Sequence, residues 1–290
     1  MPLHPFVDPA GRLRSGWWIA AFLALLAALL LPLLLLTRRR GGEVSLLEQA
    51  ALVLVASLAC QALRRRPVSD LLGPLDRSWP RQWLLGVGSG SLLMAVPALA
   101  LGLAGVASWR INAGGATTFW STLAVLAAAA AAEELLFRGF LFQRLLDGLG
   151  EWPAQFLIGA LFLLTHSDAL RDLGALGYLA AANIFLASLV FGLAYLRTGS
   201  LAIPLGLHLA ANVMQGPVLG FGVSGDLQPG LLVLALDRAP AWLHGGRFGL
   251  EASLPGLLGV AALVVVLLRW RPRAGETRRG ANSGGASPRP

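Results

Sequence analysis

Two adjacent carboxylates and an arginine stand inside an otherwise apolar stretch of the sequence. Glu133 and Glu134 follow six alanines, Ala127–Ala132, and Arg138 comes four residues after Glu134. Alanine is the strongest helix former, so we expect one helix to carry all three charges. Glu134 and Arg138 are then spaced for an ion pair, whereas Glu133 lies about 100° around the helix. A structural ion pair would explain Glu134 alone, so Glu133 is free to act as a general base.

Three more polar residues lie in apolar segments further along the chain. His166 ends one segment, and His208 and Asn212 share one face of another. A single histidine on an apolar helix is more often a packing residue, but this set, together with an unpaired glutamate, favours a polar site on three helices. The break near Gly150 places Glu133 and His166 each roughly 24–26 Å from a turn, which makes them level in an antiparallel hairpin.

The amino-acid composition indicates that transmembrane helices position these polar residues. Hydrophobic residues make up 56% of the 290 residues and charged residues only 13%. This excludes a soluble domain and predicts an all-α, polytopic membrane helical bundle of about eight transmembrane helices. Arg38–Arg40 follow the first apolar block where a signal peptide would have a cleavage site, so we expect a retained span there. The expected spans are 17–36, 44–63, 82–106, 117–147, 152–167, 174–196, 200–221 and 254–268.

The arginines predict the orientation. All 23 basic residues are arginine, and 16 of them fall on the inner side if the N-terminus is cytoplasmic. The positive-inside rule therefore predicts a multi-pass protein of the cell membrane with both termini in the cytoplasm. The expected regions are N-terminal membrane helices (1–110), a catalytic helical core (111–221), a long outer loop packed as a cap (222–252), a last membrane helix (253–270) and a disordered basic tail (271–290). We expect that tail to anchor the topology and not to bind nucleic acid.

Three short motifs occur in order on separate apolar helices. They are EExxxR at Glu133, Glu134 and Arg138, FxxxH at Phe162 and His166, and HxxxN at His208 and Asn212. In this combination the sequence resembles the CPBP intramembrane proteases, also called the Abi or CAAX-protease family, over about residues 117–221. The resemblance implies a helical bundle with a catalytic cavity inside the membrane, and endopeptidase activity on a peptide or lipid-modified protein. It marks the catalytic residues as Glu133, Glu134, Arg138, His166, His208 and Asn212.

Hydrolysis of an amide needs an activated water, a stabiliser for the oxyanion and a proton for the leaving amine. In a metal-free scheme Glu133 activates the water and Arg138 holds Glu134. His208 and Asn212 then donate to the oxyanion, and His166 orients the water.

A zinc site is the alternative scheme. His166, His208 and Glu133 match a His₂Glu set with an open fourth position for one Zn ion. We prefer the metal-free scheme, because Asn212 is a poor zinc ligand and a good donor to an oxyanion. A metal-bound Glu133 would also require Glu134 to leave its arginine and act as the base.

Two other classes of function remain open from the sequence. A proton-coupled transporter would also keep Glu, His and Arg side chains in its core. A non-catalytic membrane scaffold or immunity protein would keep the bundle without the chemistry. Dependence of uptake on Glu133 without peptide cleavage would indicate the transporter, and tolerance of alanine at every motif position would indicate the scaffold.

Overall fold

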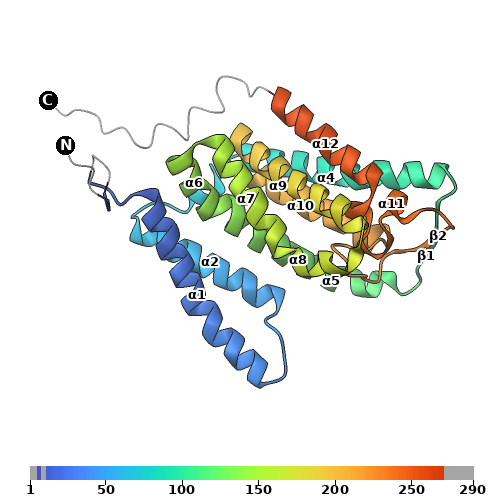
Figure 1. Ribbon diagram of the computed structural model, residues 1–290, viewed down its shortest axis with the longest axis horizontal. Helices are drawn as coiled ribbons and strands as arrows, with labels where there is room; N and C mark the ends of the chain where they lie inside the picture. The colour runs from blue at the N-terminus through green and yellow to red at the C-terminus, as the bar shows by residue number, and fades with distance from the viewer. Residues whose placement is uncertain (1–4, 8–10, 271–290) are drawn as a thin grey trace.

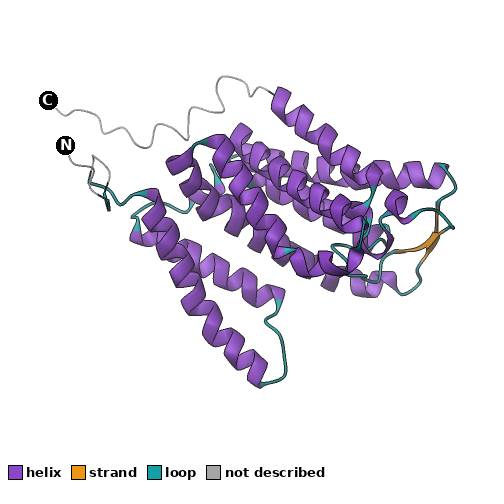
Figure 2. Cartoon of the chain, viewed as in Figure 1, coloured by secondary structure: helices purple, strands orange, loops and turns teal. Residues whose placement is uncertain are grey.

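The computed structural model describes residues 5–7 and 11–270. The expected tail, 271–290, lies outside the described residues. Helices dominate the fold, and strands occur only at one end of the described part (Figures 1 and 2). All eight ranges expected as membrane spans are helical over most of their length. The long helices are α1 (Ser15–Arg39), α2 (Leu46–Leu63), α4 (Ser78–Leu103), α5 (Gly115–Glu134), α6 (Leu141–Leu149), α7 (Glu151–Thr165), α9 (Leu176–Thr198), α10 (Ala202–Val213) and α12 (Leu254–Arg269).

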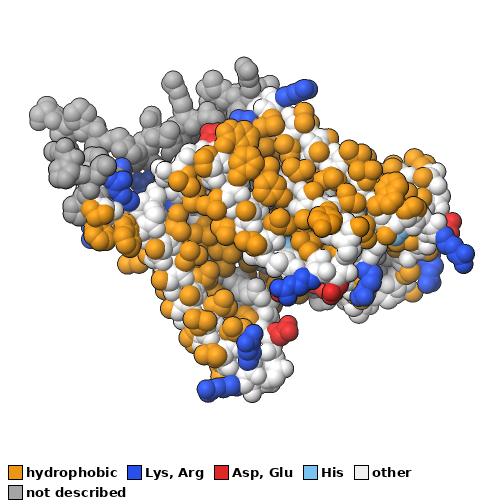
Figure 3. Space-filling view, in the orientation of Figure 1, with side chains coloured by type: hydrophobic (Ala, Val, Ile, Leu, Met, Phe, Trp, Pro, Cys, Tyr) orange, Lys and Arg blue, Asp and Glu red, His pale blue; other side chains and the backbone are white. Residues whose placement is uncertain are grey.

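Four of these helices are long and apolar enough to cross a membrane: α1, α2, α4 and α9. The apolar helices α7 and α12 are shorter, while α5 continues through a π-helical turn, η1 (Leu135–Phe140), into α6. The chain is therefore a mostly helical multi-pass membrane protein, and the count of eight spans stays a prediction. Hydrophobic side chains cover most of the face in Figure 3, and the charged ones lie largely near its margins.

A small sheet corrects the all-α expectation. Strand β1 (Ala107–Ile111) pairs antiparallel with β2 (Leu232–Leu236), with Ala107 opposite Leu236. Trp109 also donates from its indole to the carbonyl of Leu219 at 2.9 Å. The sheet forms because both connecting segments leave their backbone groups without helical partners. It ties the α4–α5 connection to the segment expected as an outer loop.

Residues 222–252 are structured and pack against the helical bundle. They contain β2, the short helix α11 (Ala241–His244) and two 3₁₀ turns, η4 (Gly246–Phe248) and η5 (Leu250–Ala252). Phe248 and Leu250 are fully buried, and η5 contacts α9, α4 and α12. We call this segment the cap. It brings side chains from outside the three motifs to the end of the bundle.

Glycines allow α4 and α10 to pack at close range. A Cβ at Gly90 would overlap the backbone oxygen of Leu207, and one at Gly206 would overlap the backbone oxygen of Trp83. Small residues at such crossings let membrane helices approach until their backbones touch. The contact fixes the position of α10, which carries the HxxxN motif.

The N-terminal hairpin of α1 and α2 stands at an angle to the rest of the bundle (Figure 1). α1 contacts α6, and α2 contacts α5 and η1. Phe22 stacks on Phe140 with ring centroids 5.0 Å apart, and Phe22 is fully buried. The most apolar window of α1 is only 6% buried, as expected for a helix that faces lipid.

Candidate active site in the helix bundle

Two of the three helices that carry the motifs, α5 and α10, change to a π-helical turn next to them. The turn η1 begins directly after Glu134, and Gly139 within it has a non-helical ψ of −107°. A second π-helical turn, η3 (Met214–Val218), begins two residues after Asn212. π-helical turns inside longer helices occur frequently at functional sites, because they redirect the side chains around them.

The predicted ion pair between Glu134 and Arg138 is present, and both side chains are fully buried. Nη1 of Arg138 lies 3.3 Å from Oε1 of Glu134. Nη2 donates to Ser188 on α9, at 2.7 Å to the hydroxyl and 3.1 Å to the carbonyl. The guanidinium lies 4.8 Å from the ring centre of Phe162 and 4.9 Å from that of Phe191. Ion pairing, hydrogen bonding and cation–π contacts therefore compensate the buried cation.

His208 joins this buried network through a hydrogen bond to Glu134. Its Nδ1 lies 2.8 Å from Oε1 of Glu134. A carboxylate that is paired with Arg138 can only accept, so Nδ1 of His208 carries the proton. The ring stacks on Phe191 with centroids 4.8 Å apart, which fixes its plane. Nε2 is thereby aimed away from Glu134.

Glu133 occupies a different environment from its neighbour. Its side chain is 33% exposed, against 0% for Glu134, and its Oε2 lies 3.7 Å from Nε2 of His208. Glu133 lines a cavity between the helices, and Glu134 does not. With Nδ1 of His208 directed at Glu134, its Nε2 faces the carboxylate of Glu133.

His166 ends α7 and is held by the phenylalanine of its motif. Its Nδ1 lies 2.9 Å from the carbonyl oxygen of Phe162, and the two rings are 4.8 Å apart. Because a carbonyl only accepts, Nδ1 of His166 donates and Nε2 stays available. Phe162 thus supports His166 through its backbone and Arg138 through its ring.

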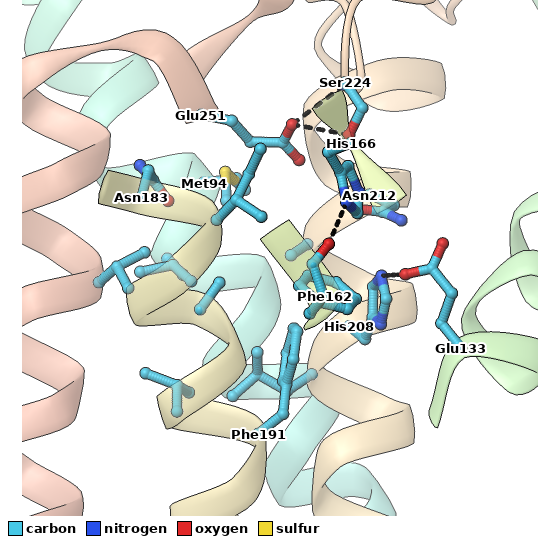
Figure 4. A pocket seen from close by; sticks show the side chains of 17 residues that line it. Met94, Glu133, Phe162, His166, Asn183, Phe191, His208, Asn212, Ser224 and Glu251 are labelled. Carbon is cyan, nitrogen blue, oxygen red and sulfur yellow. Dashed lines mark hydrogen bonds and ion pairs between the residues drawn. The ribbon is translucent and has the colours of Figure 1, made fainter. Parts of the chain in front are cut away.

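Four of the six predicted site residues line one cavity, shown in Figure 4: Glu133, His166, His208 and Asn212. Glu134 and Arg138 do not line it, and they lie behind His208 and hold it. Asn212 makes no hydrogen bond within the described residues, so its amide is available to a ligand. The remaining wall is mainly apolar and comes from α4, α7, α9, α10, α12 and the cap.

The sequence reasoning missed several residues of the site. Ser188 and Phe191 contact Arg138 and His208 from α9, and Asn183 of the same helix lines the cavity. The cap supplies Ser224 and Glu251. The sequence does single out Glu251, because it is the only acidic residue between Asp237 and the end of α12. It also singles out Asn183, as an amide inside an apolar span, but not Ser188 and Phe191, since serine and phenylalanine are common in membrane helices.

Glu251 is hydrogen-bonded to Ser224 within the cap. Its Oε2 accepts from the backbone N–H and from the hydroxyl of Ser224, each at 3.0 Å. Burial raises the pKa of Glu251 above its ordinary value, and the hydrogen bonds from Ser224 and the nearby His166 oppose that shift.

The donors proposed for zinc do not form a metal site as they stand. His166, His208 and Glu133 border the same cavity, but within residues 5–7 and 11–270 no three His, Cys, Asp or Glu side chains converge on one point. Each histidine does have an acceptor on Nδ1, as metal-bound histidines usually have. An Nδ1 acceptor orients Nε2 toward a metal and toward a substrate equally well.

Fold and site together define a membrane protein with a buried polar centre inside its helical bundle. Residues 115–214 match the family described as type II CAAX prenyl endopeptidase Rce1-like, so this part of the chain is a domain of that CAAX-protease family. The match covers all six predicted site residues and ends before the cap. No curated protein matches the chain.

Proposed function

We propose that the protein is an intramembrane endopeptidase that hydrolyses a peptide bond with a water activated by Glu133. The observation that carries the proposal is the difference between the two adjacent carboxylates. Glu134 is fully buried and paired, whereas Glu133 is one-third exposed to the cavity and lies beside His208. A base must reach both water and substrate, and Glu133 is the one of the two that faces the cavity.

In the first step a water next to Glu133 attacks the substrate carbonyl and gives its proton to the carboxylate. The oxyanion that forms needs donors, and the amide of Asn212 is one because it has no partner among the described residues. His208 donates as well when Nε2 is protonated. His208 and Asn212 are one helical turn apart on α10 and both line the cavity, so one carbonyl oxygen can reach both.

Collapse of the tetrahedral intermediate breaks the C–N bond, and the leaving nitrogen takes up a proton. Glu133 holds the proton taken from the water and can return it. His166 faces the same cavity with Nε2 free and can orient the water or the leaving group. Glu134 and Arg138 act indirectly, because Glu134 fixes the tautomer of His208 and Arg138 holds Glu134.

The substrate is a peptide or a lipid-modified protein that enters from the bilayer. The mainly apolar wall supports this proposal, since it can accept hydrophobic groups without exposing them to water. The family domain at residues 115–214 supports the same substrate class.

The test is cleavage of a panel of prenylated and unmodified peptides by purified protein in lipid micelles. Glu133→Gln should reduce the rate by at least about 10²-fold, because it removes the base and keeps the shape. Glu43→Gln, at an exposed position in the α1–α2 connection, is the matched control and should keep full activity. Full activity of Glu133→Gln would reject the proposal. Uptake that depends on Glu133 without any cleavage would favour a transporter, and function that survives alanine at all six positions would favour a scaffold.

A further inference from the structure

The cavity contains a second carboxylate that belongs to none of the three motifs. Glu251 comes from the cap and lines the same cavity as Glu133. Figure 4 shows the two glutamates on different sides of it, with His166 and His208 between them. A substrate held against Glu133 therefore extends toward Glu251.

The cap holds this carboxylate by one oxygen only. Both donors of Ser224 bind Oε2, and Oε1 has no hydrogen-bond partner within the described residues. Ser224 has φ +49°, in the left-handed region that non-glycine residues seldom adopt. A bridge between Val223 and Asp226 closes the turn around it. This strained turn fixes Glu251 with one oxygen left for another group.

No side chain with a permanent positive charge lines the cavity. Of its described lining residues, none is lysine or arginine, and the imidazoles of His166 and His208 are the only groups that can become cationic. Arg138 is committed to Glu134 and Ser188. A half-buried carboxylate without a cation is costly, and a cation supplied by a ligand would remove that cost.

We propose that Glu251 is a specificity-determining residue: it binds the ammonium or guanidinium group of a basic substrate side chain and repels substrates that place a carboxylate in the cavity. The inference rests on the proposed endopeptidase function and adds the charge of the substrate segment. Its alternative is that Glu251 only fastens the two ends of the cap to each other through Ser224. A fastening role uses Oε2 and would be satisfied by glutamine, whereas selection by charge requires the carboxylate.

The experiment compares peptides that differ at one residue, which is Lys, Gln or Glu in turn at each of three positions on either side of the cleaved bond. At one position we expect kcat/KM of the wild type for the Lys peptide to exceed that for the Glu peptide by about tenfold or more. Glu251→Gln should bring this ratio to within about twofold while the Gln peptide is still cleaved. Glu43→Gln is the control and should keep the wild-type ratio.

The possible outcomes test the role of Glu251 and the endopeptidase function separately. Equal cleavage of Lys and Glu peptides by the wild type at every position would overturn the role of Glu251 and leave the endopeptidase intact. A Lys-to-Glu ratio that stays at the wild-type value in Glu251→Gln would show a fastening role and would also overturn it. Absence of cleavage of the whole panel would reject the proposed function itself. The wild-type ratios decide even if Glu251→Gln folds poorly.

Discussion

Glu134 accepts a hydrogen bond from Nδ1 of His208 at 2.8 Å, although the two residues are 74 positions apart in the chain. This contact joins the EExxxR motif to the HxxxN motif and assigns the two glutamates to different environments. Glu134 faces Arg138 and His208 in the interior, and Glu133 faces the cavity. Glu133 and Glu134 face different environments because consecutive residues of a helix point about 100° apart.

We expect Glu134→Gln to destabilise the protein strongly. The substitution leaves the guanidinium of Arg138 buried without a counter-charge, which typically costs about 3–5 kcal/mol of the free energy of unfolding. Denaturant titration in detergent would measure the loss. Glu133→Gln makes the same change at a residue that is 33% exposed, and should keep nearly all the stability. Equal destabilisation of both variants, or loss of cleavage in Glu134→Gln only, would mean that the roles are reversed.

Ser188 should contribute to stability through Arg138. Ser188→Ala removes the hydroxyl acceptor at 2.7 Å from Nη2 and leaves only the carbonyl, so we expect a loss of about 1–3 kcal/mol. Ser121→Ala, at an exposed position on α5, is the control and should change the stability by less than about 0.5 kcal/mol. An unchanged stability of Ser188→Ala would show that the carbonyl of Ser188 and the aromatic rings suffice.

How far the sequence predicts this site depends on the range of each interaction. The Glu134–Arg138 pair is local to one helix, so its spacing was enough to predict it. The apolar blocks likewise predicted the helical ranges, because a long hydrophobic run in a membrane has few alternatives to a helix. His166 and His208 were grouped with the glutamates from their rarity in apolar segments.

The missed features depend on contacts between distant segments. The β1–β2 pairing, the contacts of Ser188 and Phe191 on α9 and the entry of Glu251 into the cavity all require the tertiary fold. Short strands in connecting segments have no hydrophobic period strong enough to stand out beside membrane helices. The acceptor role of Glu134 toward His208 was hidden for the same reason.

Gly90 should be intolerant of any side chain. A Cβ there would overlap the backbone of Leu207 and push away α10, which carries His208. We expect Gly90→Ala to lose about 1–3 kcal/mol and most of the cleavage activity. Gly88→Ala is a matched control on the same helix, because nothing lies within 4 Å of its added Cβ. It should be neutral or gain up to about 1 kcal/mol, and a comparable loss in both variants would contradict close packing as the cause.

The membrane orientation can be tested at two exposed positions in a Cys60→Ala background. The arginine distribution predicts that the α6–α7 turn is cytoplasmic and the β1–α5 connection is external. A membrane-impermeant thiol reagent added to intact cells should label Ala113→Cys and spare Glu151→Cys until the cells are opened. Labelling of Glu151→Cys alone would invert the orientation. The pairing of β1 with β2 further predicts that a cysteine in the cap behaves like Ala113→Cys.

The last prediction concerns the metal. A zinc ion here would need Nε2 of His166, Nε2 of His208 and an oxygen of Glu133 within about 2.0–2.2 Å. On the same face of α10 as His208, the free amide of Asn212 is a poor zinc ligand and a good donor to an oxyanion. Binding of zinc would also take Glu133 out of its role as base, and Glu134 could replace it only by leaving Arg138 unpaired. We therefore expect active enzyme washed with a chelator to retain its activity and to contain less than about 0.1 equivalent of zinc by elemental analysis, since a structural or catalytic site would hold one. One equivalent of zinc, whose removal abolishes cleavage and whose return restores it, would reject the metal-free mechanism and assign His166, His208 and Glu133 as its ligands.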